Sequence, residues 1–324
     1  MYSCYDINGL FGPITITLKI SLRDLFRKEL NLSWDDPIPE ELKKKWVKLL
    51  QMVKRVEEVT FRRCIKPDQP VVGKPILILS NDASTEAMCA TAHVRWELEN
   101  GSFLCHLCSS KTRVAPLTKE SVLRLKAQSG VFSVLLGKSV ITHSDLEFEE
   151  VVHILDSKCT LATLHKDTLA LKEFMGNRVS EILSTTTVDQ WYHVDTKLNI
   201  ADLGTRTTAR VEDVSEGSEW QRGKHWMCLP RSEWPTSQDI TGATVPTEEL
   251  VNKSLVAFAS STANVYNIER FRGRSYIFLL RVTATVISML RNKSLLIKAT
   301  LTAEEISHAE FLCIKASMHY TKQE

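Results

Sequence analysis

From Pro75 onward, strand and helix signals alternate, and this order restricts the fold more than any other feature of the sequence. Strand signals are apolar or alternating runs, and helix signals are apolar residues at helical spacing. Asn100-Gly101 is a hairpin signal between the second and third strands. The order βββαβαβα predicts an α/β fold built in layers. The predicted strands cover 76–80, 87–97, 102–110, 151–155 and 190–194, and the predicted helices cover 119–138, 158–173 with an extension to 183, and a stretch opening near Asn199.

Further helices are predicted on both sides of this region. A turn-rich stretch around Gly9 leads into a helix over 18–29, and the turn Asp35-Asp36-Pro37 precedes a second helix. Tryptophans among Gly, Pro and Ser indicate an irregular connector after residue 208. Two more helices are predicted over 274–290 and from Thr302, where a capping box begins. The helix that follows the turn Asp35-Asp36-Pro37 carries one apolar face, formed by Leu42, Trp46, Leu49, Leu50, Val53 and Val56.

The composition is that of an ordinary globular protein. Lys and Arg number 41 against 39 Asp and Glu, 43% of residues are hydrophobic and 25% are charged, which excludes collagen-like, coiled-coil and disordered chains. The opening residues lack the features of a secretory signal, so the eight cysteines are expected to be reduced thiols. The most apolar stretch, 277–290, is too short to span a membrane and contains Arg281, so no membrane partner is expected. These features fit an intracellular protein and do not separate cytoplasm from nucleus.

The second predicted helix also carries a basic face. A row of cations is suited to following a phosphate backbone, whereas a solvated helix face carries the same pattern, and both interpretations stay open. The basic residues are Lys43, Lys44, Lys45, Lys48, Lys54 and Arg55, with Arg62 and Arg63 just beyond.

Three aspartates stand where strands end or a helix begins. Asp82 follows the first strand and Asp156 the fourth, and strand ends on one sheet can bring two carboxylates together. Asp202 would begin the last helix, where exposed amides favour a carboxylate. Carboxylates are the ligands that Mg²⁺ prefers, and two such ions about 4 Å apart serve phosphodiester cleavage. Each aspartate taken singly is better explained as a cap or turn residue, and only their arrangement together favours a site.

Several motifs together resemble an internal piece of the Pol polyprotein of BEL/Pao-type retrotransposons, over nearly the whole length of the chain. The resemblance implies an α/β RNase H-like mixed sheet with flanking helical segments. The matching residues are Ser3–Leu10, Asn81–Ser84, Ser110–Leu117, Leu155–Ser157, Gly176–Ile182, Gln190–Val194, Asn199–Arg206 and Leu280–Ala284.

The same resemblance implies four parts. Residues 1–70 correspond to the helices at the distal end of a reverse transcriptase, and 71–208 to the RNase H-like domain. Residues 209–250 are the irregular connector, and 251–324 are a helical segment that would precede an integrase zinc-binding module. The implied partners are an RNA·DNA hybrid or other nucleic acid and other Pol-derived segments.

The resemblance also implies a site, with one departure. Asp82, Asp156 and Asp202 correspond to the catalytic carboxylates and Mg²⁺ ligands of the family, but Lys126 stands where a fourth carboxylate belongs. This exchange moves the set from a formal charge of about −4 to −2, so metal affinity should fall and the nuclease should be impaired. A lysine could instead take the place of the cation. The residues expected to bind nucleic acid are Lys44, Lys45, Lys48, Lys111, Arg113 and Arg206.

Other functions stay open. One is a non-catalytic nucleic-acid-binding or interaction module. Another is an aspartic peptidase of the Pao type, although Asp82-Ala83-Ser84 and Asp156-Ser157-Lys158 lack the glycine that lets such loops turn tightly. Cys105 and Cys108 could contribute to a zinc site and His193 could act as a general base, but buried thiols and a structural histidine explain them more simply.

Overall fold

The computed structural model describes residues 6–26, 32–33, 35–251, 280–286 and 306–310. The chain divides into two compact units, Met1–Val251 and Asn252–Glu324. In the second unit residues 280–286 and 306–310 are helical. The remainder of the helix predicted over 274–290, and the capping box at Thr302, lie outside the described residues. Within the described part of the chain, no helix is long and apolar enough to cross a membrane.

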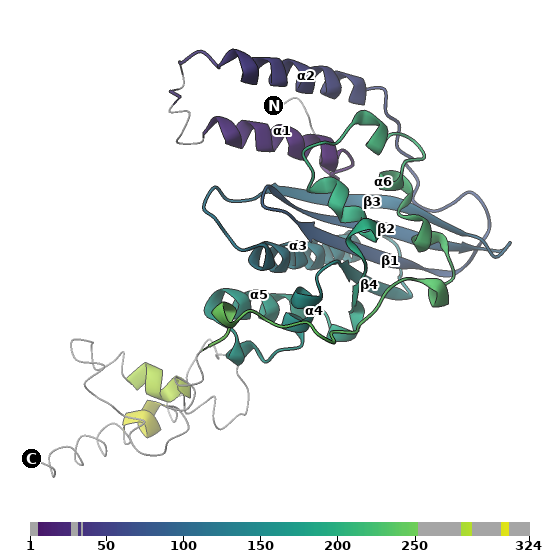
Figure 1. Ribbon diagram of the computed structural model, residues 1–324. Helices are drawn as coiled ribbons and strands as arrows, with labels where there is room; N and C mark the ends of the chain where they lie inside the picture. The colour runs from purple at the N-terminus through teal and green to yellow at the C-terminus, as the bar shows by residue number, and fades with distance from the viewer. Residues whose placement is uncertain (1–5, 27–31, 34, 252–279, 287–305, 311–324) are drawn as a thin grey trace, which may run out of the picture. The chain divides into compact units, whose positions relative to one another are not determined.

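A five-stranded mixed sheet forms the centre of the first unit (Figure 1). Its order is β3-β2-β1-β4-β5, in which β1 pairs antiparallel with β2 and parallel with β4. The predicted α/β class and strand order along the chain are therefore confirmed. The strands are β1 (Val71–Ala83), β2 (Ala87–Leu98), β3 (Phe103–Val114), β4 (Glu150–Leu155) and β5 (Trp191–His193).

Helices cover both faces of the sheet, so β1 is buried on both sides from Pro75 onward. Leu77 and Leu79 of β1 pack with α3, while Ile78 packs with the tryptophan-rich connector on the other side. Helix α3 approaches closely, since a Cβ at Gly137 would lie 2.4 Å from a methyl carbon of Leu79. Figure 1 shows α3 (Val122–His143), α4 (Lys158–Leu164) and α5 (Glu173–Leu183) on one side, with α1 (Gly12–Leu25), α2 (Glu40–Val56) and α6 (Glu219–Arg222) on the other.

The two N-terminal helices differ from their predicted forms. Helix α1 begins at Gly12 rather than at residue 18, because Pro13 in the first turn suits a helix start. In α2 the predicted apolar face is only partly buried: Leu49 and Val56 are buried, whereas Leu50 is 59% exposed. The helical spacing predicted an apolar face and made no prediction about its burial.

Three local predictions are also wrong. The helix predicted over 158–183 is two helices, because it stops after Leu164 and the Asp167 carboxylate caps a separate short turn. The expected last helix is a short 3₁₀ turn, η4 (Ile200–Gly204), in which Gly204 lies so close to Cys89 that a Cβ would reach within 2.3 Å of Sγ. The third strand, predicted to end at residue 110, continues in β3 to Val114.

The connector, residues 209–250, packs against the sheet. Trp220, Trp226 and Trp234 are all buried. The Arg95 guanidinium of β2, itself buried, donates to the backbone oxygens of Met227 at 2.8 Å and of Leu229 at 2.6 Å. Backbone bonds between His193 and Ser237 cover the outer edge of β5. The three indole rings are therefore core residues and are not exposed for stacking on bases.

Candidate active site

Asp82 and Asp156 meet at the carboxyl edge of the parallel pair β1 and β4. Asp82 is the penultimate residue of β1, and Asp156 directly follows β4. Their side chains are only 6% and 3% exposed. Two neighbouring parallel strands that end together thus place two buried carboxylates side by side, as the strand pattern predicted.

Lys126 joins the two carboxylates. It lies in the second turn of α3, and its Nζ is 2.5 Å from Asp156 Oδ1 and 3.3 Å from Asp82 Oδ1. The lysine side chain is 17% exposed. A single ammonium group therefore bridges both aspartates through charge-assisted contacts.

The electrostatics keep this lysine protonated. Burial alone would lower the pKa of Lys126, but the charge of Asp82 and the hydrogen bond and charge of Asp156 together raise it. Burial and the neighbouring charge of Asp156 raise the pKa of Asp82, and the ammonium and the Thr205 hydroxyl oppose this shift. With both aspartates ionised, the three groups carry a formal charge of −1.

The second oxygen of Asp82 is also in use. Thr205 directly follows η4, and its hydroxyl donates to Asp82 Oδ2 over 2.8 Å. The same hydroxyl oxygen lies 3.1 Å from the backbone oxygen of Asp202. Both carboxylate oxygens of Asp82 therefore have protein partners. Thr205 was not identified from the sequence, where it appeared only within the longer Asn199–Arg206 motif.

A buried amide network holds the site segments together. The Asn199 side chain donates to the backbone oxygen of Asn81 over 2.9 Å and accepts from the backbone of Ala201 over 3.1 Å. Asn81 in turn donates to the backbone oxygen of Ile154 over 3.1 Å and accepts from the Ser129 hydroxyl over 3.2 Å. These bonds fix η4, β1, β4 and α3 relative to each other. Both asparagines stood beside the predicted aspartates, but this role was not foreseen.

Asp202 lines the same open hollow, which has a volume of about 510 Å³, as Asp82, Asp156 and Lys126. Its carboxylate forms an ion pair with Arg206, one helical turn away. Within the described residues, no three His, Cys, Asp or Glu side chains form a group that could hold a metal ion. Each of the three aspartates thus has a cationic partner within the protein.

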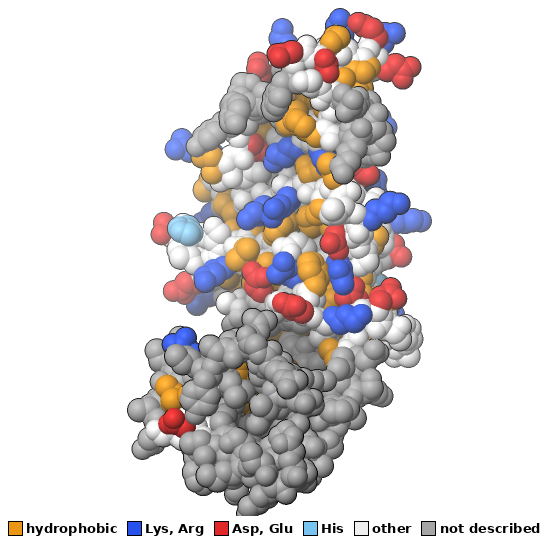
Figure 2. Space-filling model, turned by 90° about the vertical axis from the view of Figure 1, so that its left-hand side faces the viewer, with side chains coloured by type: hydrophobic (Ala, Val, Ile, Leu, Met, Phe, Trp, Pro, Cys, Tyr) orange, Lys and Arg blue, Asp and Glu red, His pale blue; other side chains and the backbone are white. Residues whose placement is uncertain are grey.

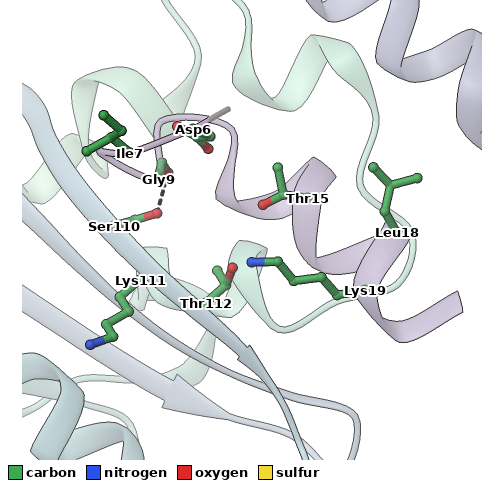
Figure 3. A pocket seen from close by; sticks show the side chains of 9 residues that line it. All are labelled: Asp6, Ile7, Gly9, Thr15, Leu18, Lys19, Ser110, Lys111 and Thr112. Carbon is green, nitrogen blue, oxygen red and sulfur yellow. Dashed lines mark hydrogen bonds between the residues drawn. The ribbon is translucent and has the colours of Figure 1, made fainter. Parts of the chain in front are cut away.

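The residues expected to bind nucleic acid lie on different parts of the sheet. Lys111 and Arg113 of β3 are exposed and lie 5.6 and 6.0 Å from the ring of Phe132 in α3. In Figure 3, Lys111 points away from a hollow of about 230 Å³ into which Thr112 and Lys19 of α1 project. Lys111 and Arg113 are therefore on the α3 face of the sheet.

Lys44, Lys45 and Lys48 are exposed on α2, on the opposite side of the sheet. Arg206 lines the hollow of the aspartates but is engaged by Asp202. Figure 2 shows Lys and Arg side chains interspersed with Asp and Glu over the face in view, rather than one continuous basic surface. The predicted basic residues thus form at least two separate groups.

The remaining candidates have structural surroundings. Cys105 is buried in β3, and burial raises its pKa well above the ordinary value, so a thiolate is disfavoured. Burial and the charge of Lys158 lower the pKa of His193, against the opposing effect of Asp156. Its backbone is paired with Ser237. His193 does not line the hollow of the aspartates.

The sheet order, the parallel β1–β4 pair and the carboxylates at its edge define an α/β domain of the RNase H-like class. Residues 1–157 match the family described as the Pao retrotransposon-like RNaseH-like domain, and this match supports a Pao-type retrotransposon RNase H-like region in that part of the chain. The match ends one residue after Asp156, so it includes β1 to β4 and α3, whereas β5 and η4 lie beyond it. No curated protein and no solved structure matches the chain.

Proposed function

We propose that this domain derives from a metal-dependent nuclease that cleaves RNA in RNA·DNA hybrids, and that it is weak or inactive because Lys126 takes the place of the metal. The observation that carries the proposal is the bridge from Lys126 Nζ to Asp156 at 2.5 Å and to Asp82 at 3.3 Å. An ammonium at that point supplies the positive charge that a divalent ion would otherwise bring. The domain then keeps its fold but loses the metal-dependent cleavage of RNA.

The residues present do not fit Mg²⁺ as they are arranged. Mg²⁺ needs several oxygen ligands in nearly octahedral geometry. Asp82 is engaged by Lys126 and Thr205, Asp156 by Lys126, and Asp202 by Arg206. A metal would have to displace a partly exposed ammonium whose pKa is raised by the same carboxylates. No metal-assisted step is therefore assigned to these residues.

A non-catalytic role in nucleic-acid binding is the second candidate. It is favoured by the exposed lysines 44, 45 and 48 of α2, which have no ion-pair partner among the described residues. Other Pol-derived segments are natural partners for such a module. The peptidase alternative gains no support, because two aspartates that share an ammonium do not need to share a proton.

The decisive experiment measures Mg²⁺-dependent cleavage of a labelled RNA·DNA hybrid by the whole chain and by Lys126→Glu. We expect Lys126→Glu to cleave at least about tenfold faster than the natural chain, since one ligand of a metal site is worth more than about 1.4 kcal/mol. Lys138→Glu is the matched control, because Lys138 is an exposed lysine of the same helix. Equal cleavage by the natural chain and Lys126→Glu would contradict the proposal.

A further inference from the structure

A basic groove lies at the outer edge of β3, between the segment that follows α2 and helix α6. Two adjoining hollows, with volumes of about 260 and 470 Å³, share the side chains of Phe61, Arg62, His106 and Gln221. Arg63 lines the first hollow and Arg222 the second. We call this the α2-end groove. It is separated from Asp82 of β1 by the whole of β2, because β3 is the edge strand.

The groove carries uncompensated positive charge. Its three arginines face two acidic residues, Asp68 and Glu216. Arg62 is paired with Asp68, and Glu216 lies 3.4 Å from the Thr60 hydroxyl. Within the described part of the chain, neither Arg63 nor Arg222 forms an ion pair. Two guanidinium groups are thus free to bind an anion.

His106 adds a polar group that lacks a partner. Its Nε2 is buried and makes no hydrogen bond with any described residue. Burial and the charges of Arg62 and Arg222 lower the pKa of His106, which keeps the ring neutral at pH 7. A neutral imidazole protonated at Nε2 can donate one hydrogen bond, and a buried donor without an acceptor is unusual in a folded protein. An anionic oxygen in the groove would satisfy it.

A row of cations on α2 leads towards the groove. Lys44, Lys48 and Arg55 are spaced by four and seven residues and so share one face of the helix. Arg55 contacts Glu212, in the same connector segment as Glu216, at 2.6 Å. The row spans about 16 Å at 1.5 Å per residue. A single phosphate would occupy only the groove, whereas a polyanion can also follow the row.

We propose that the α2-end groove holds one phosphodiester of a nucleic-acid strand, between Arg63 and Arg222 beside His106, and that neighbouring phosphates follow Lys44 and Lys48. This inference rests on the proposed nucleic-acid function but names a surface separate from the aspartates and from Lys126. Phosphodiester oxygens are the acceptors that guanidinium groups bind best. The strand is held by its backbone, so the site should not distinguish base sequences.

The test is fluorescence anisotropy of the whole chain with a labelled RNA·DNA hybrid over a range of salt concentrations. The double variant Arg63→Gln, Arg222→Gln is expected to bind about tenfold more weakly at 0.15 M salt, with a salt slope shallower by about 1.5. The matched control is Lys138→Gln, Lys166→Gln, which removes two exposed lysines on the α3 side. Unchanged melting by circular dichroism shows that both variants are folded.

The outcomes separate the groove from the proposed function. If the groove variant binds as the control does, the groove assignment is overturned, whatever Lys126→Glu does in the cleavage assay. Equally tight binding of an oligoglutamate of the same charge would also overturn it, in favour of an acidic peptide. Loss of affinity in Arg63→Gln, Arg222→Gln with unchanged folding supports the groove, even where no variant cleaves the hybrid.

Discussion

The ammonium nitrogen of Lys126 lies 2.5 Å from Oδ1 of Asp156, and the same nitrogen reaches Asp82. Without the lysine, two carboxylates at the ends of β1 and β4 would face each other with little solvent around them. With the lysine in place, its ammonium group balances part of the negative charge of the two carboxylates. This contact has consequences for stability, for metal binding and for pH dependence.

Replacing Lys126 by methionine should destabilise the domain at pH 7. The change leaves two buried carboxylates without their cation, and breaking a buried pair costs about 3 kcal/mol or more before partial exposure is taken into account. Because the lysine is partly exposed, we expect a loss of about 2 kcal/mol in the free energy of unfolding by urea. Lys138→Met should change it by less than about 0.5 kcal/mol. Equal stability of the two variants would show that the bridge contributes nothing.

Mg²⁺ should stabilise Lys126→Glu but not the natural chain. A ligand that binds only the folded state adds about 1.4 kcal/mol at ten times its Kd. In 10 mM MgCl₂ the melting temperature of Lys126→Glu is expected to rise by several degrees over its value in EDTA. The natural chain should melt at the same temperature in both. A rise for the natural chain would mean that the metal competes successfully with the ammonium.

Acid should destabilise the domain through two buried histidines. Burial lowers the pKa of His93 to about 4, and it lowers that of His153, which stacks on Trp191, to about 3. Stability is full above the unfolded pKa of about 6.5 and is lost as the pH falls towards the folded values, because the unfolded chain then binds the protons. Between pH 7 and 5 the two together should cost about 3–4 kcal/mol. Urea titrations at pH 7 and pH 5 should show a clearly smaller loss of stability on acidification for His153→Gln than for the natural chain. His165→Gln, at an exposed position, should lose as much stability as the natural chain.

Asn199→Ala should destabilise η4 and its attachment to β1. The substitution removes the acceptor for Ala201 and the donor for the Asn81 backbone oxygen, both of which are buried. Unsatisfied buried groups cost about 1–3 kcal/mol each, so a total loss of about 2–6 kcal/mol is expected for the two groups. Hydrogen exchange should be faster at Ala201 and neighbouring amides. Asn177→Ala, at an exposed position of α5, is the control and should exchange like the natural chain.

Ending the chain at residue 208 should abolish cooperative unfolding. The shortened chain loses Trp220, Trp226 and Trp234, whose rings complete the core on one face of the sheet. Removal of one buried tryptophan costs about 3–5 kcal/mol, which is comparable to the whole stability of many domains. A chain ending at residue 251 keeps these rings and should melt in a single transition by near-UV circular dichroism. A cooperative melt of the 208-residue chain would contradict this.

The order of strands and helices could be predicted because β1 and β4 contain short apolar runs and β2 alternates, and these patterns do not depend on distant contacts. The break between α4 and α5 could not be predicted, since the backbone N–H of Lys172 donates to the backbone oxygen of the distant residue Glu249. The exposure of Leu50 likewise depends on which part of α2 finds a partner. Helical spacing defines a face but does not say how much of it is covered.

The candidate site was predictable in part. The strand pattern placed Asp82 and Asp156 at the ends of two strands of one sheet, and the family resemblance singled out Lys126. The contacts of the lysine with both carboxylates depend on the approach of α3 to the sheet, which the sequence does not specify. The hydrogen bond from Thr205 to Asp82 and the network of Asn81 and Asn199 join residues more than 100 positions apart. Their only signal was their position beside the aspartates.

Each edge strand of the sheet, β3 and β5, is hydrogen-bonded to a distant segment of the chain. The Ser110 backbone of β3 donates to Asn8, and His193 of β5 exchanges bonds with Ser237. Exposed strand edges promote intermolecular pairing, and natural sheets avoid this by covering them. Fragments that begin after Asn8 or end before Ser237 would therefore offer bare edges and should self-associate. Solubility at high protein concentration thus depends on segments outside the sheet itself.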